Sequence, residues 1–253
     1  MRKLFVFDLD DTLIDNVHDY AKPILDAIWI IIRTLGSKAP HVTKLITIEH
    51  EIDARRRHEI NLETGKEFLY CMERFPGSQV ATYREICQQT TVTPNPAVEA
   101  KLYQIGMKAF DERLYRRNIK PGVKQVLKFL CTQGDTLVLF SKGDSRVQTK
   151  KLKALKAAGI DCFTKVRVED LKTPKIFQEI CDEFPGLSPI SIGNSYESDI
   201  IPALEVGYFG IYIPVETWEV IGKMDEIAAK VDKSRCLILT DIHQIISFYG
   251  RLP

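Results

Sequence analysis

Two aspartates, Asp8 and Asp10, follow directly after a hydrophobic run near the start of the chain. Residues 4–7 form a short apolar run rich in β-formers, which is typical of a strand buried on both faces. Carboxylates are costly to bury, so we expect both aspartates where this strand ends. Open α/β sheets bind their ligands at the carboxyl ends of strands. The sequence therefore indicates a site with two carboxylates at this edge of a sheet.

Two such carboxylates can divide the work of a displacement reaction. One ionised carboxylate attacks an electrophile, while its neighbour carries the proton for the leaving group. A divalent cation between them would reduce their repulsion and hold an anionic substrate. Taken alone, the cluster is also compatible with a plain turn or a helix cap, in which Asp11 or Thr12 binds backbone N–H groups.

A hydroxyl group lies at the end of a second hydrophobic run. Residues 136–140 predict a strand, and Ser141, Lys142 and Gly143 follow it. The Ser141 side chain and the backbone N–H groups of a glycine-containing turn can donate to phosphate oxygens. An ordinary strand-to-helix turn capped by Ser141 or Asp144 is the alternative interpretation.

The first motif and the order of those that follow resemble the haloacid dehalogenase (HAD) superfamily, most of whose members are magnesium-dependent phosphatases. Residues 8–12 read Asp-Leu-Asp-Asp-Thr and match the family pattern Asp-x-Asp-x-Thr. The resemblance implies that Asp8 is the nucleophile that becomes an aspartyl-phosphate, and that Asp10 is the general acid and base. It also implies that Ser141, with Lys142 beside it, binds the phosphoryl group.

The resemblance implies, in addition, a lysine that neutralises charge around the nucleophile. Residues 172–177 read Lys-Thr-Pro-Lys-Ile-Phe, close to the family pattern Lys-x-Pro-x-x-Phe. Lys172 is the better candidate, because a proline at the first helical position fixes where the preceding side chain is presented. Lys175 is the alternative.

A last motif is expected to complete a magnesium site. The family pattern Gly-Asp-Ser-x-x-x-Asp corresponds to residues 193–199, in which Asn194 replaces the first aspartate. An asparagine carbonyl is an acceptable but neutral ligand for a hard cation, so we expect weaker binding of Mg²⁺. The ligands that the resemblance implies are Asp8, Asp10 through its backbone carbonyl, Asn194 and Asp199.

Composition agrees with a soluble intracellular enzyme. The 35 basic residues nearly balance the 34 acidic ones, so no field attracts nucleic acid or an anionic membrane, and neither partner is indicated. The six cysteines lack metal or disulfide spacing, and several lie in apolar surroundings that suit reduced core thiols. Residues 29–32 are too short an apolar run to span a bilayer and predict a buried helix stripe. Without room for a signal peptide, a cytoplasmic location is expected.

The arrangement of the elements predicts an α/β fold: a Rossmann-like three-layer core with a parallel sheet, plus an inserted all-helical cap domain. Strands expected at 136–140, 165–168, 188–192 and 209–213 alternate with helices at 123–131, 146–158, 175–183 and 199–206. Residues between 12 and 121 show helical periodicity, with breaks at 36–40, 76–77 and 93–96. We expect the core at 1–14 and 119–253 and the cap at 15–118.

These features favour a magnesium-dependent phosphatase that hydrolyses a small phosphorylated metabolite. Asp10 matters here, because a general acid assists an alkoxide leaving group but is wasted on a halide. In the family the cap selects the substrate, and Arg55-Arg56-Arg57-His58-Glu59 fits a solvated helix face better than a binding site. The alternatives are a haloacid dehalogenase or phosphomutase on the same scaffold, or a catalytically faded HAD-like binding module. The sequence does not indicate the oligomeric state.

Overall fold

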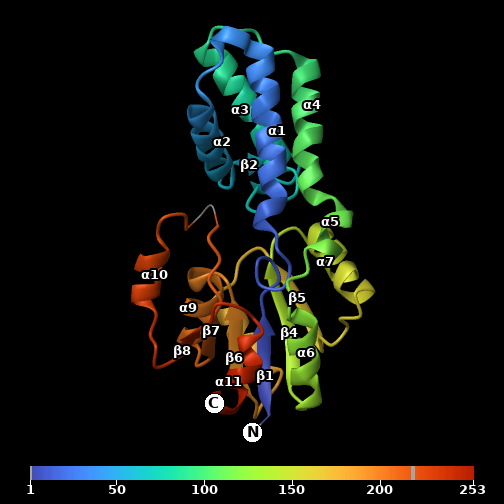
Figure 1. Cartoon of the computed structure of the whole chain (residues 1–253), viewed down its shortest axis with the longest axis vertical. Helices are drawn as coiled ribbons and strands as arrows, with labels where there is room; N and C mark the ends of the chain where they lie inside the picture. The colour runs from blue at the N-terminus through green and yellow to red at the C-terminus, as the bar shows by residue number, and fades with distance from the viewer. Residues whose placement is uncertain (1, 218–219) are drawn as a thin grey trace. The chain divides into compact units, whose positions relative to one another are not determined.

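The computed structural model describes residues 2–217 and 220–253 and divides into two compact units. One unit consists of Met1–Val17 and Tyr115–Pro253, and the other of His18–Leu114. The first is built around a parallel sheet and the second around helices (Figure 1). Among the described helices, none combines the length and the apolar character needed to cross a bilayer.

Six parallel strands form the sheet of the first unit, in the order β5-β4-β1-β6-β7-β8. The β1 strand lies between β4 and β6, where Phe7 pairs with Leu139 and with Ile192. This arrangement confirms the predicted α/β core. The strands are β1 Lys3–Phe7, β4 Thr136–Lys142, β5 Lys165–Glu169, β6 Ser188–Gly193, β7 Phe209–Tyr212 and β8 Cys236–Ile238.

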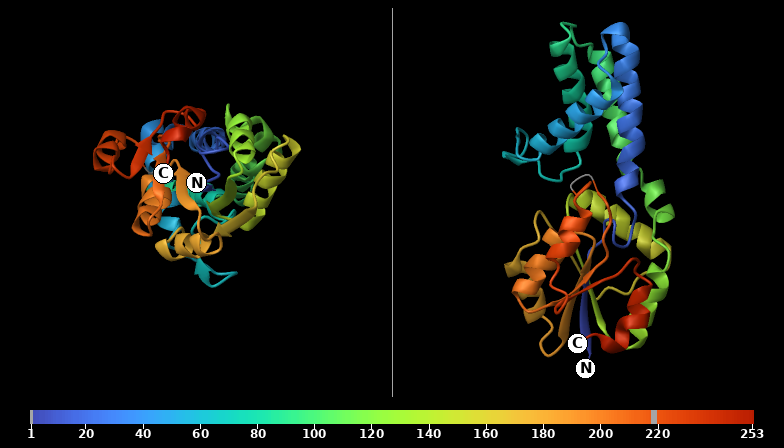
Figure 2. Two further views of the ribbon diagram at one scale, coloured as in Figure 1. Left: turned by 90° about the horizontal axis from the view of Figure 1, so that it is seen from below. Right: turned by 60° about the vertical axis from the view of Figure 1, so that its left-hand side comes forward.

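Helices cover both faces of this sheet (Figure 2). Alternate residues of β1 point to opposite faces, so Phe5 and Phe7 belong to one hydrophobic cluster and Leu4 and Val6 to another. The first cluster includes residues of α6, α7 and α11, and the second includes residues of α8 and α9. The helices of this part are α5 Glu112–Arg117, α6 Val123–Thr132, α7 Ser145–Ala157, α8 Pro174–Asp182, α9 Ile201–Glu205, α10 Met224–Lys230 and α11 Gln244–Phe248.

Two parts of the core differ from the expectations. The helix expected at residues 199–206 begins as a π-helical turn, Tyr196–Ile200, and continues as α9. The elements β8, α10 and α11 were not predicted from the sequence. These elements are three, seven and five residues long, which is too short for hydrophobic periodicity to identify them.

The second unit contains four main helices: α1 Val17–Leu35, α2 Val42–Arg56, α3 Arg74–Gln89 and α4 Pro96–Met107. It is not entirely helical, because β2 Ile60–Asn61 and β3 Lys66–Glu67 form a short antiparallel hairpin. The break expected at residues 76–77 was also wrong. Pro76 and Gly77 lie in the first turn of α3, where a proline is tolerated because its missing N–H has no helical partner.

The buried stripe expected at residues 29–32 is only partly buried. These residues lie in α1, where Ile31 is buried but the Trp29 side chain is 58 % exposed. Four consecutive helical positions cannot all face one core, since successive residues are rotated by about 100°. The buried stripe of α1 instead follows helical spacing through Ile24, Ile28, Ile31 and Leu35.

The arginine run differs from a plain solvated helix face. The Cζ atom of Arg56 lies 4.8 Å from the ring centroid of Phe68, and that of Arg57 lies 5.4 Å from the ring centroid of Tyr70. Guanidinium groups stack favourably on aromatic faces. We therefore interpret these two arginines as anchors for residues 57–73, which connect α2 to α3.

The six cysteines are free thiols, but they are not all in the core. Cys87 and Cys236 are buried, Cys71, Cys162 and Cys181 are partly buried, and Cys131 is exposed. Cys131 lies near the end of α6, where its sulfur is 4.0 Å from the carbonyl oxygen of Cys162. The expectation of core thiols therefore holds for two of the six.

A buried polar network joins α2 to α3 in the helical unit. Glu49 is 2 % exposed and accepts a hydrogen bond from Gln79 at 2.6 Å. Asp53 forms an ion pair with Arg74 and accepts a hydrogen bond from Ser78 at 2.8 Å. Burial, with a smaller contribution from Asp53, raises the pKa of Glu49 to about 7.

This raised pKa predicts a pH-dependent stability of the protein. Glu49 is protonated in the folded state and ionised in the unfolded state between pH 4.5 and about 7, so the stability it contributes falls as pH rises through this range. Glu49→Gln should therefore increase the free energy of unfolding at pH 8 by about 3 kcal/mol, with little effect near pH 4.5. Urea unfolding at both pH values measures this, with Glu51→Gln, an exposed position on α2, as the control. An equal effect of Glu49→Gln at both pH values would contradict the interpretation.

Candidate active site

Asp8 is the first residue after β1 and is 7 % exposed. Its backbone N–H continues the sheet by donating to the carbonyl oxygen of Ile192 at 2.9 Å. Its side chain accepts hydrogen bonds from Lys172 at 2.7 Å and from the Thr12 hydroxyl at 2.9 Å. Burial is the main reason that the pKa of Asp8 is raised to about 7, and Lys172 opposes that rise. A carboxylate at the end of the central strand is thus held by two donors.

Lys172 lies between two buried carboxylates. Its ammonium group donates to Asp8 at 2.7 Å and to Asp199 at 2.8 Å, and its side chain is 2 % exposed. Burial disfavours the charged ammonium, but Asp199 and Asp8 outweigh this and raise the pKa of Lys172. Lys175 is exposed in the first turn of α8. Of the two candidate lysines, Lys172 is therefore the one beside Asp8.

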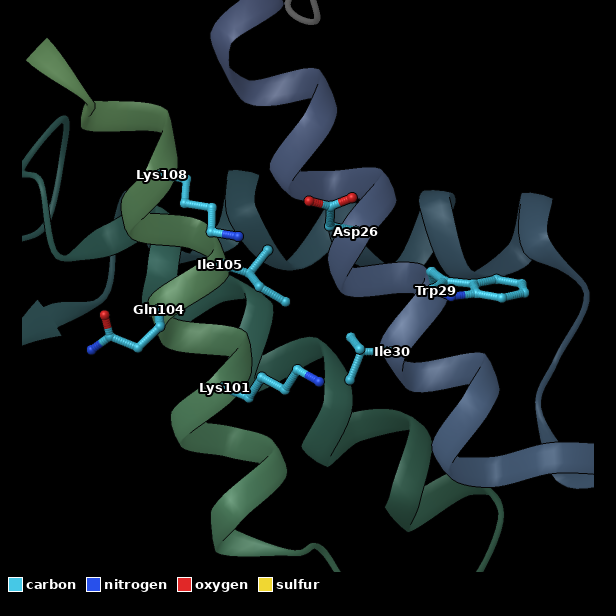
Figure 3. A pocket seen from close by; sticks show the side chains of 7 residues that line it. All are labelled: Asp26, Trp29, Ile30, Lys101, Gln104, Ile105 and Lys108. Atoms are coloured by element: carbon cyan, nitrogen blue, oxygen red, sulfur yellow. The ribbon is translucent and has the colours of Figure 1, made fainter. Parts of the chain in front are cut away.

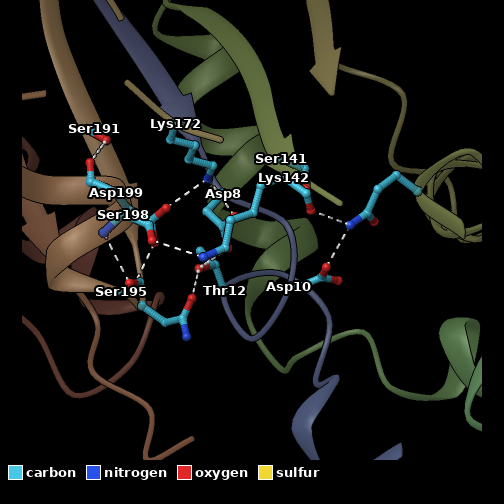
Figure 4. A network of polar contacts seen from close by, with 12 residues as sticks. Asp8, Asp10, Thr12, Ser141, Lys142, Lys172, Ser191, Ser195, Ser198 and Asp199 are labelled. Carbon is cyan, nitrogen blue, oxygen red and sulfur yellow. Dashed lines mark hydrogen bonds and ion pairs between the residues drawn. The ribbon is translucent and has the colours of Figure 1, made fainter. Parts of the chain in front are cut away.

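Asp10 points to a different part of the site (Figure 4). One oxygen accepts a hydrogen bond from Gln148 at 2.7 Å, and the other accepts one from Lys151 at 2.5 Å. Both partners lie on α7 and were not predicted as site residues. Gln148 and Lys151 occupy the buried face of α7 together with Val147 and Leu155. Two polar residues at buried helical positions are the sequence signal that could have indicated them.

Asp11 has the capping role that was the alternative interpretation of this cluster. It adopts a left-handed backbone conformation with φ 59°, and its side chain accepts hydrogen bonds from the N–H groups of Asn16 and Val17. Thr12 instead donates toward Asp8. The helix-capping contact and the paired carboxylates therefore coexist, because different residues of the same loop form them.

Ser141 and Lys142 are the last residues of β4, which is adjacent to β1. Ser141 is 1 % exposed, and its hydroxyl lies 3.4 Å from the carbonyl oxygen of Lys142. The Lys142 ammonium donates to Ser198 at 3.0 Å. Figure 4 shows both residues at the same strand ends as Asp8. The structure thus places the predicted phosphate-binding residues at the same edge of the sheet as the predicted nucleophile.

Asp199 is fixed by three contacts, one from Lys172 and two from within residues 191–199. One oxygen accepts the bond from Lys172, the other accepts one from the backbone N–H of Ser195 at 2.9 Å, and its own carbonyl oxygen accepts one from Ser191 at 2.7 Å. Its carboxylate lies directly against Gly193, where any Cβ atom would overlap the Asp199 side chain. The close packing therefore requires glycine at position 193.

Gly193→Ala should displace the Asp199 carboxylate and, with it, the ammonium of Lys172. We expect at least a ~10²-fold loss of hydrolase activity, because a shift of about 1 Å in a reacting group has an effect of this size. The measurement is kcat/KM with the best available substrate, beside Gly250→Ala, where a Cβ meets no atom within 4 Å. Wild-type kcat/KM in Gly193→Ala would show that the position of Asp199 is unimportant.

The oxygen atoms beside Asp8 fit part of a site for a hard cation. The Thr12 hydroxyl is 2.9 Å from Asp8 Oδ2 and 3.3 Å from Asn194 Oδ1. The carboxylate oxygen of Asp8 and the amide oxygen of Asn194 therefore lie beside the same hydroxyl group. Both are oxygen ligands of the kind that Mg²⁺ prefers. Within residues 2–217 and 220–253, no three His, Cys, Asp or Glu side chains gather as a metal cluster. The oxygens of Asp199 and of the Asp10 side chain are held by the partners described above.

A separate hollow of about 300 Å³ lies between α1 and α4 in the helical unit. Its lining includes Asp26 and Ile30 of α1, Lys101 and Ile105 of α4, and Lys108 directly after α4 (Figure 3). The remaining lining residues are Trp29 and Gln104. This lining lacks the predicted nucleophile, the hydroxyl and the paired carboxylates that the sheet edge brings together.

The fold and the residues at the strand ends agree with the protein family that this sequence matches. A model of haloacid dehalogenase-like hydrolases matches residues 2–207. The chain belongs to the haloacid dehalogenase-like hydrolase family. No curated protein matches the chain by sequence.

Solved structures of the same fold include proteins described by both activities of the family. A haloacid dehalogenase-like hydrolase from Xanthomonas campestris has a TM-score of 0.67 at 20 % identity, covering 99 % of this chain and 95 % of that one. A predicted phosphoglycolate phosphatase from Haemophilus somnus has a TM-score of 0.58 at 19 % identity and 98 % coverage of both chains. L-2-haloacid dehalogenase from Xanthobacter autotrophicus has a TM-score of 0.53 at 14 % identity and full coverage of both. At these identities the likeness concerns the fold alone.

Proposed function

We propose that this protein is a magnesium-dependent phosphatase that hydrolyses a small phosphate monoester through an aspartyl-phosphate intermediate. The observation that carries the proposal is the pair of aspartates with separate partners. Asp8 is bound by Lys172 and Thr12, whereas Asp10 is bound by residues of α7. Environments that differ in this way suit a nucleophile and a separate proton carrier.

In the proposed reaction, Asp8 attacks phosphorus in line with the leaving oxygen. Asp10 delivers a proton to that oxygen and later takes one from the water that hydrolyses the aspartyl-phosphate. Lys172 and the donors around Ser141 stabilise the charge on the phosphoryl oxygens. A general acid typically contributes ~10²–10⁴-fold with an alkoxide leaving group, and a halide does not need one. Asp10 therefore favours a phosphatase over a dehalogenase.

The proposal includes Mg²⁺, held by Asp8, the backbone carbonyl of Asp10 and Asn194. When bound, the ion would neutralise negative charge on the phosphoryl group. Asp199 is the fourth proposed ligand, and its two oxygens also accept hydrogen bonds from Lys172 and from the backbone N–H of Ser195.

Replacing the neutral ligand tests this assignment. Asn194→Asp should lower the Mg²⁺ concentration for half-maximal activity by ~10-fold, because a carboxylate binds a hard cation more strongly than an amide does. A magnesium titration of activity in metal-free buffer measures this, beside the wild type. An unchanged half-maximal concentration would place Asn194 outside the metal site.

A paired assay tests the proposed function. The wild-type protein is assayed with p-nitrophenyl phosphate and with L-2-chloropropionate, each with EDTA and with millimolar Mg²⁺. We expect phosphate release that requires Mg²⁺ and no release of chloride. Chloride release without the metal would replace the proposal with a dehalogenase, and no turnover of a broad panel of phosphate esters would favour a binding module. A screen of phosphorylated metabolites would then identify the substrate.

A further inference from the structure

Two residues of α7 hold the side chain of Asp10 from two directions. Gln148 Nε2 donates to Oδ2 at 2.7 Å, and Lys151 Nζ donates to Oδ1 at 2.5 Å. The two residues are three positions apart and therefore share one face of the helix. Because each carboxylate oxygen has its own donor, rotation of the Asp10 carboxylate would break both bonds.

Lys151 is a fixed partner and not a solvated surface lysine. Its side chain is 2 % exposed, whereas that of Asp10 is 24 % exposed. The ammonium group also donates to Asn16 at 2.8 Å and lies 5.4 Å from the ring centroid of Tyr115. A buried charge is costly unless it is paired, so Lys151 is confined to these partners.

Gln148 connects Asp10 to the end of β4. Its Nε2 also donates to the carbonyl oxygen of Lys142 at 2.9 Å, and Gln148 is 3 % exposed. Both acceptors require the nitrogen of the amide, which leaves its oxygen without a hydrogen-bond partner among the described residues. One amide thus joins the proposed proton carrier to the segment proposed to bind the phosphoryl group.

We infer that Gln148 and Lys151 are positioning residues, which hold the Asp10 carboxylate at the place where it exchanges a proton with the leaving oxygen. This inference rests on the proposed function. A proton is transferred efficiently only when the two heavy atoms are about 2.6–3.2 Å apart, so a loose Asp10 would be a poor acid. The two residues touch neither substrate nor phosphorus in this scheme and act through Asp10.

Leaving groups of different basicity separate this role from a general structural one. We compare kcat/KM for p-nitrophenyl phosphate, whose leaving group needs little protonation, with that for glycerol phosphate, whose alkoxide needs a general acid. Lys151→Met and Gln148→Glu should lower kcat/KM for glycerol phosphate by ~10²-fold and that for p-nitrophenyl phosphate by less than ~5-fold. Lys153→Met, an exposed position on the same helix, is the matched control and should change neither value.

Equal losses with both esters, or no loss with either, would overturn the inference. Gln148→Glu keeps the size of the side chain, so it serves as the test if Lys151→Met does not fold. Crystal structures of the variants give a reading that does not depend on activity: we expect the Asp10 side chain to leave its position while the end of β4 is unchanged. An unmoved Asp10 overturns the inference. If the wild type hydrolyses no ester of the broad panel, the proposed function fails, and the crystal structures still decide whether these residues hold Asp10.

Discussion

Asp8→Asn should reduce phosphatase activity on the order of 10⁴-fold or more, which is the size of loss seen when a catalytic nucleophile is removed. The amide is almost isosteric and can still accept a hydrogen bond from Thr12, but it cannot attack phosphorus to form an acyl phosphate. The measurement is kcat with p-nitrophenyl phosphate and Mg²⁺. Intact-protein mass spectrometry after rapid quenching should detect a phosphorylated species in the wild type and none in the variant.

The expected loss is chemical and not structural. Burial and the carboxylates of Asp199 and Asp10 together disfavour an ionised Asp8 more than Lys172 favours it, so removing its charge should not destabilise the fold. Thermal unfolding of Asp8→Asn checks this, and Asp225→Asn, an exposed position on α10, controls for the loss of a carboxylate elsewhere. Wild-type turnover or a phosphorylated species in Asp8→Asn would reject Asp8 as the nucleophile.

The placement of residues at strand ends was predictable because it depends on hydrophobic runs. Residues 4–7, 136–140 and 188–192 each read as buried strands, and the structure pairs β1 with both β4 and β6. Parallel strands present their carboxyl ends at one edge of a sheet, so Asp8, Ser141 and Asn194 follow from the strand assignments alone. Their chemical roles remain predictions.

Contacts between distant side chains could not be predicted in the same way. The bonds from Gln148 and Lys151 to Asp10 join residues 138 and 141 positions apart, and local sequence does not specify such pairs. The orientation of Asp199 likewise depends on the tight approach to Gly193 and on the π-helical turn. A lysine at a buried helical position shows that a partner must exist without indicating which residue it is.

The helical unit shows a second reason for wrong predictions. Pro76-Gly77 has the composition of a turn, yet tertiary packing places it inside the first turn of α3. Gly106 of α4 approaches so closely that a Cβ there would overlap the backbone of Pro76. Contact between two helices thus outweighed the local turn signal.

Lys172→Met should destabilise the protein and also impair its activity. The substitution leaves Asp8 and Asp199 buried without the ammonium that now binds both of them. Removing one partner of a buried ion pair typically costs ~3–5 kcal/mol. We expect a loss of this size in the free energy of unfolding at pH 8, measured with urea, and Lys175→Met, which is exposed on α8, should be near wild type.

The dependence of this loss on pH and on Asp199 tests its cause. Burial already raises the pKa of Asp8 to about 7, so at pH 5 a proton can replace the missing ammonium and the loss should shrink. Adding Asp199→Asn to Lys172→Met should recover part of the stability at pH 8, because one of the two unpaired carboxylates is then neutral. A loss that is the same at pH 5 and pH 8, and unaffected by Asp199→Asn, would mean that pairing with Asp8 and Asp199 is not its cause, and would favour the contact of the Lys172 ammonium with the Phe140 ring, whose centroid lies 5.1 Å from Nζ.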